Sequence, residues 1–137
     1  MAKIILGQRP KNFTRTVQFK QVDGSSGQIE VTYTYRSRTE FAAFADSIRE
    51  QVKAGDEAMI EKIKALAAEG KQLSQADIVA EENATNVAYV MGCIEGWNLD
   101  VPFDRAAVAQ LADEVPAAVT AIIGTYRDAI VEGRLGN

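Results

Sequence analysis

Histidine is absent from the 137 residues of this chain, and cysteine occurs once, at Cys93. Histidine is the commonest general base near neutral pH and the commonest zinc and iron ligand, so its absence argues against most hydrolytic mechanisms. One cysteine forms no internal disulfide, cannot hold zinc alone and, without a histidine to activate it, is a poor nucleophile. We therefore expect no catalytic residues, no cofactor and no metal site, and a Cys93 that packs as a small apolar side chain.

Long apolar runs are also lacking. The longest is far shorter than the roughly 20 residues that cross a membrane, and residues 1–6 are too short for the core of a signal peptide. Gly24 and Gly27 have neither the spacing nor the following lysine of a phosphate-binding loop. Adjacent carboxylates on a helix point apart, so the acidic pairs predict solvated surfaces: Asp56-Glu57, Glu81-Glu82 and Asp113-Glu114. These features favour a cytoplasmic protein that is not an enzyme.

The charge is divided unevenly along the chain. Residues 1–38 contain seven basic and two acidic side chains, a net charge of +5, whereas the whole chain carries −4 and the remaining 99 residues therefore −9. Clustered positive charge attracts nucleic acid or an acidic protein surface. The alternative is that these basic residues are simply solvated on a loop and a hairpin.

The first third of the chain predicts a β-hairpin. Residues 16–20 and 28–35 alternate between apolar and polar side chains, and the Asp-Gly-Ser-Ser-Gly run at 23–27 is typical of a turn. One face of the second strand would be apolar, formed by Ile29, Val31, Tyr33 and Tyr35. An isolated hairpin is marginally stable in water, so we expect helices to cover that face.

Everything after Ser37 has helical periodicity. Ser37 with Glu40 and Ser74 with Asp77 predict helix starts, with a break or bend at Gly55-Asp56 between them. The helix after Ser74 is expected to continue through an apolar stripe that Trp97 ends as a core residue: Val87, Val90, Met91, Ile94 and Trp97. Two more helices begin at Asp104, as N-cap, and at Pro116, and Gly133 ends the last.

Together these patterns predict an α+β fold in which an N-terminal antiparallel β-hairpin packs against a mainly helical C-terminal body of four to five helices. We expect a single domain over residues 1–137, with a basic arm and the hairpin in residues 1–36 and the helical body in residues 37–137.

Both ends of the chain resemble one family. Gly96-Trp97 precedes an Asp100-Val101-Pro102 turn, two helical stretches and a terminal Arg134-Leu135-Gly136-Asn137. The opening Leu6-Gly7-Gln8-Arg9-Pro10-Lys11-Asn12-Phe13 and the later stretch Tyr35-Arg36-Ser37-Arg38-Thr39-Glu40-Phe41 agree with it. In this combination the sequence resembles the small tail assembly chaperones of long-tailed bacteriophages.

The resemblance implies a stoichiometric function rather than a catalytic one. Such a chaperone covers the long helical tape measure protein in the host bacterial cytoplasm, helps to recruit tail tube subunits, and is absent from the mature virion. Its partners would be the tape measure and tail tube proteins, with no small-molecule substrate and no membrane. Two alternatives stay open: a permanent structural component of a phage tail or neck, and a nucleic-acid-binding regulator that uses the basic segment, although the sequence has no recognisable nucleic-acid-binding motif.

Candidate partner-binding residues lie in two segments. The N-terminal arm is basic and irregular, and residues 56–70 carry both signs of charge around a short apolar stripe. Binding surfaces are usually formed by exposed, weakly held segments of this kind. The candidates are Arg9, Lys11 and Arg15 in the first segment and Met59, Ile63 and Leu66 in the second.

Overall fold

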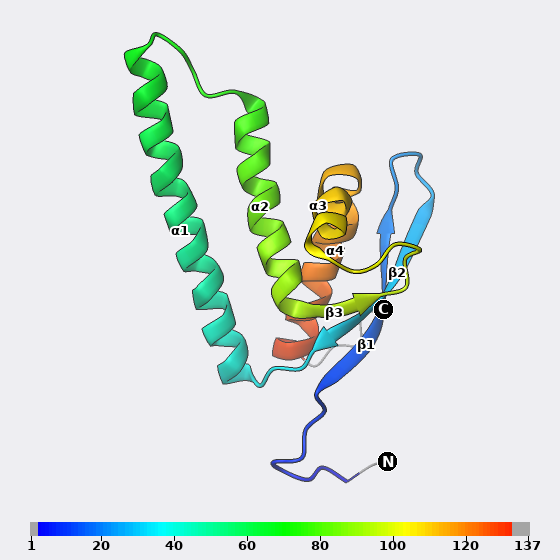
Figure 1. Cartoon of the computed structure of the whole chain (residues 1–137). Coiled ribbons are helices and arrows are strands. Elements are labelled where there is room, and N and C mark those ends of the chain that lie inside the picture. The colour runs from blue at the N-terminus through cyan, green and yellow to red at the C-terminus, as the bar shows by residue number, and fades with distance from the viewer. Residues whose placement is uncertain (1–2, 133–137) are drawn as a thin grey trace.

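The computed structural model describes residues 3–132 and has the α+β architecture that the sequence predicts (Figure 1). A three-stranded antiparallel sheet in the order β1-β2-β3 lies against helices. The elements along the chain are β1 (Asn12–Lys20), β2 (Ser26–Thr34), α1 (Arg38–Ala68), α2 (Gln75–Cys93), β3 (Ile94–Trp97), α3 (Arg105–Glu114), α4 (Pro116–Arg127) and a π-helical turn, η1 (Asp128–Glu132).

The predicted hairpin is confirmed. Strands β1 and β2 pair without interruption from Asn12↔Thr34 to Lys20↔Ser26. In the turn, the Asp23 carboxylate accepts a hydrogen bond from the Ser25 backbone N–H at 2.9 Å, and Gly24 adopts a φ of 86°, which favours glycine. The apolar face of β2 is buried as expected, except that Tyr35 lies beyond the end of the strand and is partly exposed.

The expectation that α2 continues to Trp97 is wrong. The helix ends at Cys93, and Ile94–Trp97 forms β3 against the second edge of β2. Asn98 holds this pairing from beyond the strand: its side-chain oxygen accepts from the Glu30 N–H at 3.0 Å, and its own N–H donates to the Glu30 carbonyl at 3.1 Å. The unpaired backbone groups of β2 thus provide hydrogen bonds that favour a strand over another helical turn.

The predicted break at Gly55-Asp56 is also wrong, because α1 runs unbroken for 31 residues. Gly55 does not bend the helix but allows α2 to approach it closely, because a Cβ there would lie within 2 Å of the Glu81 carboxylate on α2. The helix ends where Gly70 takes a φ of 72°.

Local chemistry sets the helix starts as predicted. Capping boxes form at Ser37 with Glu40 and at Ser74 with Asp77, and the Asp104 carboxylate accepts from the Ala107 N–H at 2.8 Å. Pro116 occupies the first turn of α4. Gly133, the expected end of the last helix, lies outside the described residues.

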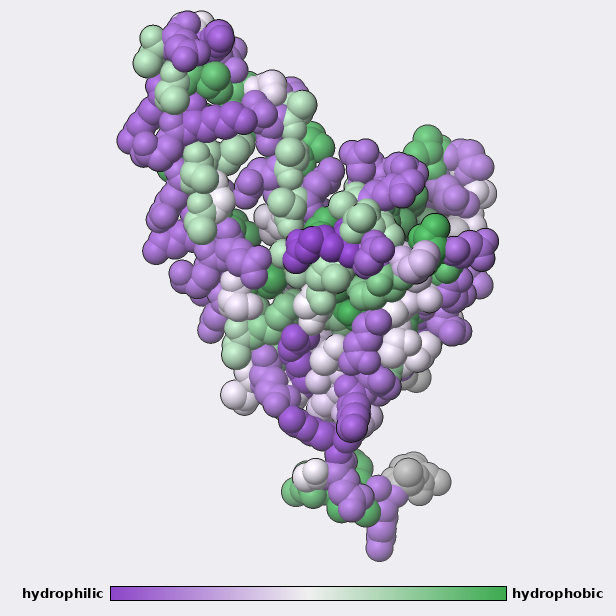
Figure 2. Space-filling model, viewed as in Figure 1, coloured by the Kyte–Doolittle hydropathy of each residue, from purple (hydrophilic) through white to green (hydrophobic). Residues whose placement is uncertain are grey.

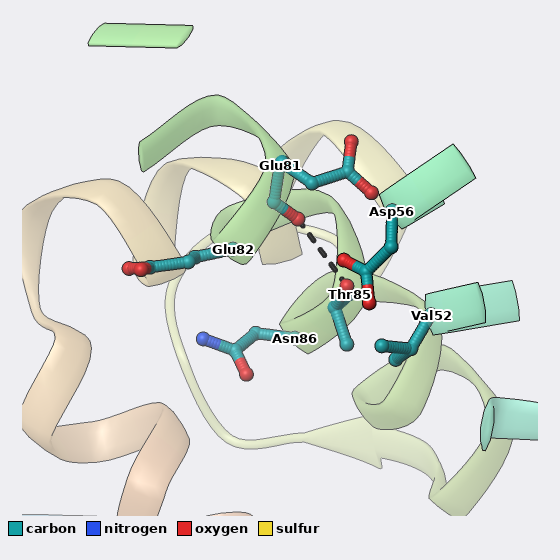
Figure 3. Close-up of a pocket in the computed structure, with 6 residues that line it drawn as sticks. All are labelled: Val52, Asp56, Glu81, Glu82, Thr85 and Asn86. Atoms are coloured by element: carbon teal, nitrogen blue, oxygen red, sulfur yellow. Dashed lines mark hydrogen bonds between the residues drawn. The ribbon is translucent and has the colours of Figure 1, made fainter. Parts of the chain in front are cut away.

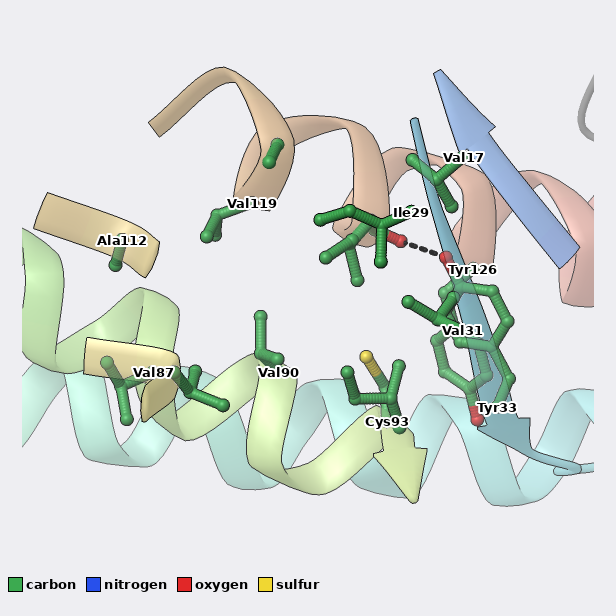
Figure 4. Packing of buried hydrophobic residues seen from close by; sticks show 14 of the residues in the cluster. Val17, Ile29, Val31, Tyr33, Val87, Val90, Cys93, Ala112, Val119 and Tyr126 are labelled. Carbon is green, nitrogen blue, oxygen red and sulfur yellow. Dashed lines mark hydrogen bonds between the residues drawn. The ribbon is translucent and has the colours of Figure 1, made fainter. Parts of the chain in front are cut away.

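The core lies between the sheet and the helices α2, α3 and α4 (Figure 4). Two buried tyrosines cross it: the Tyr33 hydroxyl donates to the Ile122 carbonyl at 2.7 Å, and the Tyr126 hydroxyl donates to the Thr34 carbonyl at 2.8 Å. Cys93 is fully buried here, as expected. Trp97 packs against the core but from strand β3, with its indole N–H donating to the Val101 carbonyl at 2.9 Å.

Helices α1 and α2 form a hairpin whose far half extends beyond the sheet (Figure 1). Phe44, near the start of α1, is the one buried residue of that helix. Within residues 3–132 no single helix is long and apolar enough to cross a membrane, although the bent pair Arg105–Glu114 and Pro116–Val131, at 112°, together reaches that length and composition.

Candidate partner-binding surfaces

The described residues contain little of the geometry that catalysis needs. Across residues 3–132 no three His, Cys, Asp or Glu side chains are placed to hold a metal ion, and no polar or charged residue is fully buried. Burial raises the pKa of the Cys93 thiol to about 12, so the reactive thiolate is scarce at neutral pH. The remaining candidates are surfaces, and three of them have distinct chemistry.

The first surface is the basic end of the molecule, where Arg9 and Lys11 precede β1. Arg9 donates to the Glu40 carboxylate at 2.8 Å and lies over the Tyr35 ring at 5.7 Å, which ties the arm to the start of α1. The hydrogen bond from Arg9 is the main reason that the pKa of Glu40 falls to about 2. Lys11 is exposed, and its carbonyl accepts from the Tyr35 N–H at 3.0 Å.

Arg15, the third basic candidate, lines a pocket of about 270 Å³ together with Arg36 and Arg38. Its guanidinium lies over the Phe13 ring at 4.9 Å, and one terminal nitrogen donates to the Thr14 carbonyl at 2.9 Å. Its Nε is buried and has no hydrogen-bond partner among the described residues. The structure therefore places a partly desolvated positive charge in a pocket with aromatic walls.

Arg36, which the sequence does not indicate as a site residue, lines this pocket and connects it to α2 and α4. Its guanidinium donates to the Gly92 carbonyl at 2.7 Å and to the Tyr126 hydroxyl at 2.9 Å, and it lies over the Phe44 ring at 4.1 Å. Its two hydrogen-bond partners are 56 and 90 residues away, so no local pattern signals the role. The only sequence hint is its place between aromatic and basic residues in Tyr35-Arg36-Ser37-Arg38.

The second surface is the far half of the α1/α2 hairpin, where the three apolar candidates are not equivalent. Lys62 of α1 binds Asp77 of α2 at 2.9 Å, which identifies the side of α1 that faces α2. Met59 and Leu66, one turn to either side of Lys62, are partly buried. Ile63 is 46% exposed and its neighbour Ile60 is 50% exposed, so the solvent-facing apolar pair is Ile60 and Ile63.

An acidic pocket of about 420 Å³ lies between the two helices of this hairpin (Figure 3). It brings together carboxylates that the sequence predicts as separate solvated pairs. In the view of Figure 3, Asp56 and Glu81 lie on one side, and Glu82 points away from them. The residues lining the pocket are Val52, Asp56, Glu81, Glu82, Thr85 and Asn86.

The third surface is the N-terminal arm itself, where exposed apolar side chains precede the basic residues that the sequence predicts as binding candidates. Ile4, Ile5 and Leu6 are 89%, 56% and 93% exposed. Figure 2 shows hydrophobic atoms on the arm, away from the body of the molecule. Three consecutive large apolar side chains in water are a feature of binding segments.

The six predicted residues thus do not form one surface. Arg9, Lys11 and Arg15 lie near the start of β1, whereas Met59, Ile63 and Leu66 lie toward the other end of α1 (Figure 1).

Comparison with known proteins identifies the family. No curated protein and no solved structure matches this chain. The family described as phage tail assembly chaperone matches residues 1–137, the whole of the sequence. This match confirms the resemblance that the two ends of the chain indicate. The chain belongs to the phage tail assembly chaperone family.

Proposed function

We propose that this protein acts as a non-catalytic chaperone that binds the tape measure protein and helps to recruit tail tube subunits around it. The observation that carries the proposal is the family match over the whole chain. The exposed apolar residues at two separate places, the arm and the far half of α1, support it because they provide contact area for a partner.

The physical requirement on such a chaperone is to cover apolar stripes on a long helical partner until the permanent partner arrives. The amphipathic hairpin α1/α2 suits this, because apolar side chains at helical spacing, such as Ile60 and Ile63, pack into the grooves of another helix. The net charge of −9 on residues 39–137 would keep the complex soluble.

This proposal places the protein in the host bacterial cytoplasm during assembly and outside the finished virion. A chaperone leaves when tube subunits replace it, so its contacts need modest affinity. Mass spectrometry of purified virions is expected to detect the tape measure and tube proteins and not this chain. Its presence at stoichiometric level would favour a permanent tail or neck component.

The direct test is co-expression with the tape measure protein. The partner is expected to stay soluble and to co-elute with this chain on size exclusion. Two variants test these surfaces: charge reversal of the predicted Arg9, Lys11 and Arg15, and Ile60→Glu with Ile63→Glu, which pairs the predicted Ile63 with its exposed neighbour. Each is expected to reduce capture and keep the fold, because these side chains are at least partly exposed.

Val22→Glu is the matched control, since Val22 is fully exposed on the hairpin turn and outside both surfaces. Equal insolubility of the partner with and without this chain would contradict the chaperone function. Full capture by both variants would keep the function but remove Arg9, Lys11 and Arg15, and the exposed pair Ile60 and Ile63, as the interface.

A further inference from the structure

Strand β1 is an edge of the sheet with backbone groups that point away from β2. Two hydrogen bonds continue the β1–β2 ladder just beyond its ends. The Tyr35 N–H donates to the Lys11 carbonyl at 3.0 Å, and the Gln21 N–H donates to the Ser25 carbonyl at 2.8 Å. Residues bonded to the neighbouring strand alternate along an antiparallel ladder, so odd-numbered residues of β1 bond to β2. The N–H and C=O groups of Thr14, Thr16 and Gln18 therefore face outward.

This edge has few of the features that protect exposed strands from pairing. Its nine residues contain no proline, and the pairing with β2 has no bulge. The residues whose backbone groups face outward are exposed and, apart from Lys20 at the end, uncharged: Asn12, Thr14, Thr16, Gln18 and Lys20. Natural proteins usually block an edge of this length with proline, a bulge or a row of lysines.

The arginine pocket lies beside this edge. Arg15 reaches the outward carbonyl of Thr14, and Phe13 and Arg15 project from β1 into the pocket that Arg38 and Ile130 also line. Among residues 3–132, no carboxylate forms an ion pair with Arg15, Arg36 or Arg38. Guanidinium groups bind carboxylates in planar, two-bond geometry.

We propose that the outer edge of β1 binds an extended, acidic segment of a partner protein, which adds a fourth strand to the sheet and places a carboxylate against Arg15. The inference rests on the proposed function, because the segment belongs to a tail protein that the chaperone holds. It adds the site, the conformation and the charge of the bound segment.

The occupant is a polypeptide because only a peptide backbone offers donors and acceptors that match an outward strand edge. Its charge follows from the pocket, where Arg15, Arg36 and Arg38 form no ion pair with any carboxylate of residues 3–132. The side chains of Phe13, Arg15 and Val17 lie on the face of β1 that the helices cover. The bound segment is therefore expected to have the sequence pattern apolar, any residue, acidic, any residue, apolar, with its apolar and acidic side chains on the same face.

The probe is a blocked, labelled peptide, Thr-Val-Thr-Glu-Thr-Val-Thr, in which Val, Glu and Val share one face of the strand, compared with the same peptide carrying Lys in place of Glu. Fluorescence anisotropy is expected to show binding of the Glu peptide and at least about tenfold weaker binding of the Lys peptide. Amide exchange followed by NMR on the full chain is expected to slow at Thr14, Thr16 and Gln18 when the Glu peptide binds, and not at exposed amides elsewhere.

Two variants with matched controls test the edge and the charge. Thr16→Pro removes an outward N–H that β2 does not use, whereas Thr16→Ala keeps it; only the proline variant is expected to weaken binding, by about tenfold. Arg15→Gln is expected to weaken binding of the Glu peptide and not of the Lys peptide. Arg49→Gln, on the exposed surface of α1, is expected to change the binding of neither peptide. The thermal midpoint establishes that each variant folds.

Equal binding of the two peptides, unchanged exchange at the outward amides of the unmodified chain, or tighter binding of an oligothymidine strand would overturn the inference. The exchange measurement uses the unmodified chain, so it tests the inference even if Thr16→Pro does not fold. Capture of the tape measure protein that survives both Thr16→Pro and Arg15→Gln would overturn the inference and leave the proposed function intact. Absence of capture by the unmodified chain would instead contradict the proposed function.

Discussion

At the scale of single residues, Glu40 joins the N-terminal arm to the helical body. One carboxylate oxygen accepts from the Ser37 N–H at 2.9 Å and closes the capping box of α1, and the other accepts from Arg9 at 2.8 Å. Both contacts favour the ionised carboxylate, and together they lower its pKa to about 2. The same side chain therefore starts a helix and fixes the arm.

The lowered pKa of Glu40 predicts that the folded state loses stability as the pH falls. A carboxyl whose pKa is lower in the folded state stabilises the fold above its ordinary pKa of about 4.5, and this contribution is lost as the pH falls toward 2. The thermal midpoint is expected to fall more steeply between these pH values in the unmodified chain than in Glu40→Gln. Glu50→Gln, on the exposed surface of α1, is the control. Parallel curves for all three proteins would contradict the role of Glu40.

At the scale of elements, two helical glycines have opposite surroundings. A Cβ on Gly92 of α2 would lie 2.5 Å from the Phe44 ring of α1, whereas a Cβ on Gly124 of α4 would have no atom within 4 Å. Close approach of α1 and α2 therefore depends on the missing side chain at Gly92. Gly124 has no such role.

Alanine at these two positions is expected to change stability in opposite directions. Gly92→Ala overpacks the contact with Phe44 and should lower the free energy of unfolding by about 1–3 kcal/mol. Gly124→Ala improves helix propensity without a clash and should raise it by about 0.5–1 kcal/mol. Urea titration measures both. A stabilised Gly92→Ala would mean that α1 and α2 approach less closely than the structure shows.

Element by element, prediction from the sequence succeeded where the cause is local. Caps at Ser37, Ser74 and Asp104 and the hairpin turn depend on residues a few positions apart, and all are confirmed. Strand β3 was missed because Ile94 and Trp97 are three residues apart, which fits a helix, while the strand depends on the distant edge of β2. The role of Arg36 likewise depends on Gly92 and Tyr126, which only the fold brings near.

At the scale of the whole molecule, burial is concentrated at one end. The buried residues of α1 and α2 are Phe44, Val87, Val90 and Cys93, all in the halves of the helices nearest the sheet. Beyond Gly55, contact between the helices depends on partly buried apolar side chains and the Lys62–Asp77 ion pair. A pocket lined by the Asp56 and Glu81 carboxylates lies between the two helices. The far half of the hairpin is therefore expected to open without unfolding the core.

Native-state hydrogen exchange measured by mass spectrometry tests this division. Amides of residues 56–80 are expected to exchange through local opening, much faster than those of β2 and α4, because few buried contacts must break. Lys62→Gln should speed exchange in residues 56–80 and leave the global thermal midpoint unchanged, since it removes a contact specific to that half. Lys64→Gln is the matched control, because its ion pair with Glu61 lies within α1 and does not bridge the two helices. Equal protection along the whole of α1 would show that the hairpin unfolds only together with the core, and a surface held that rigidly would bind the partner without opening.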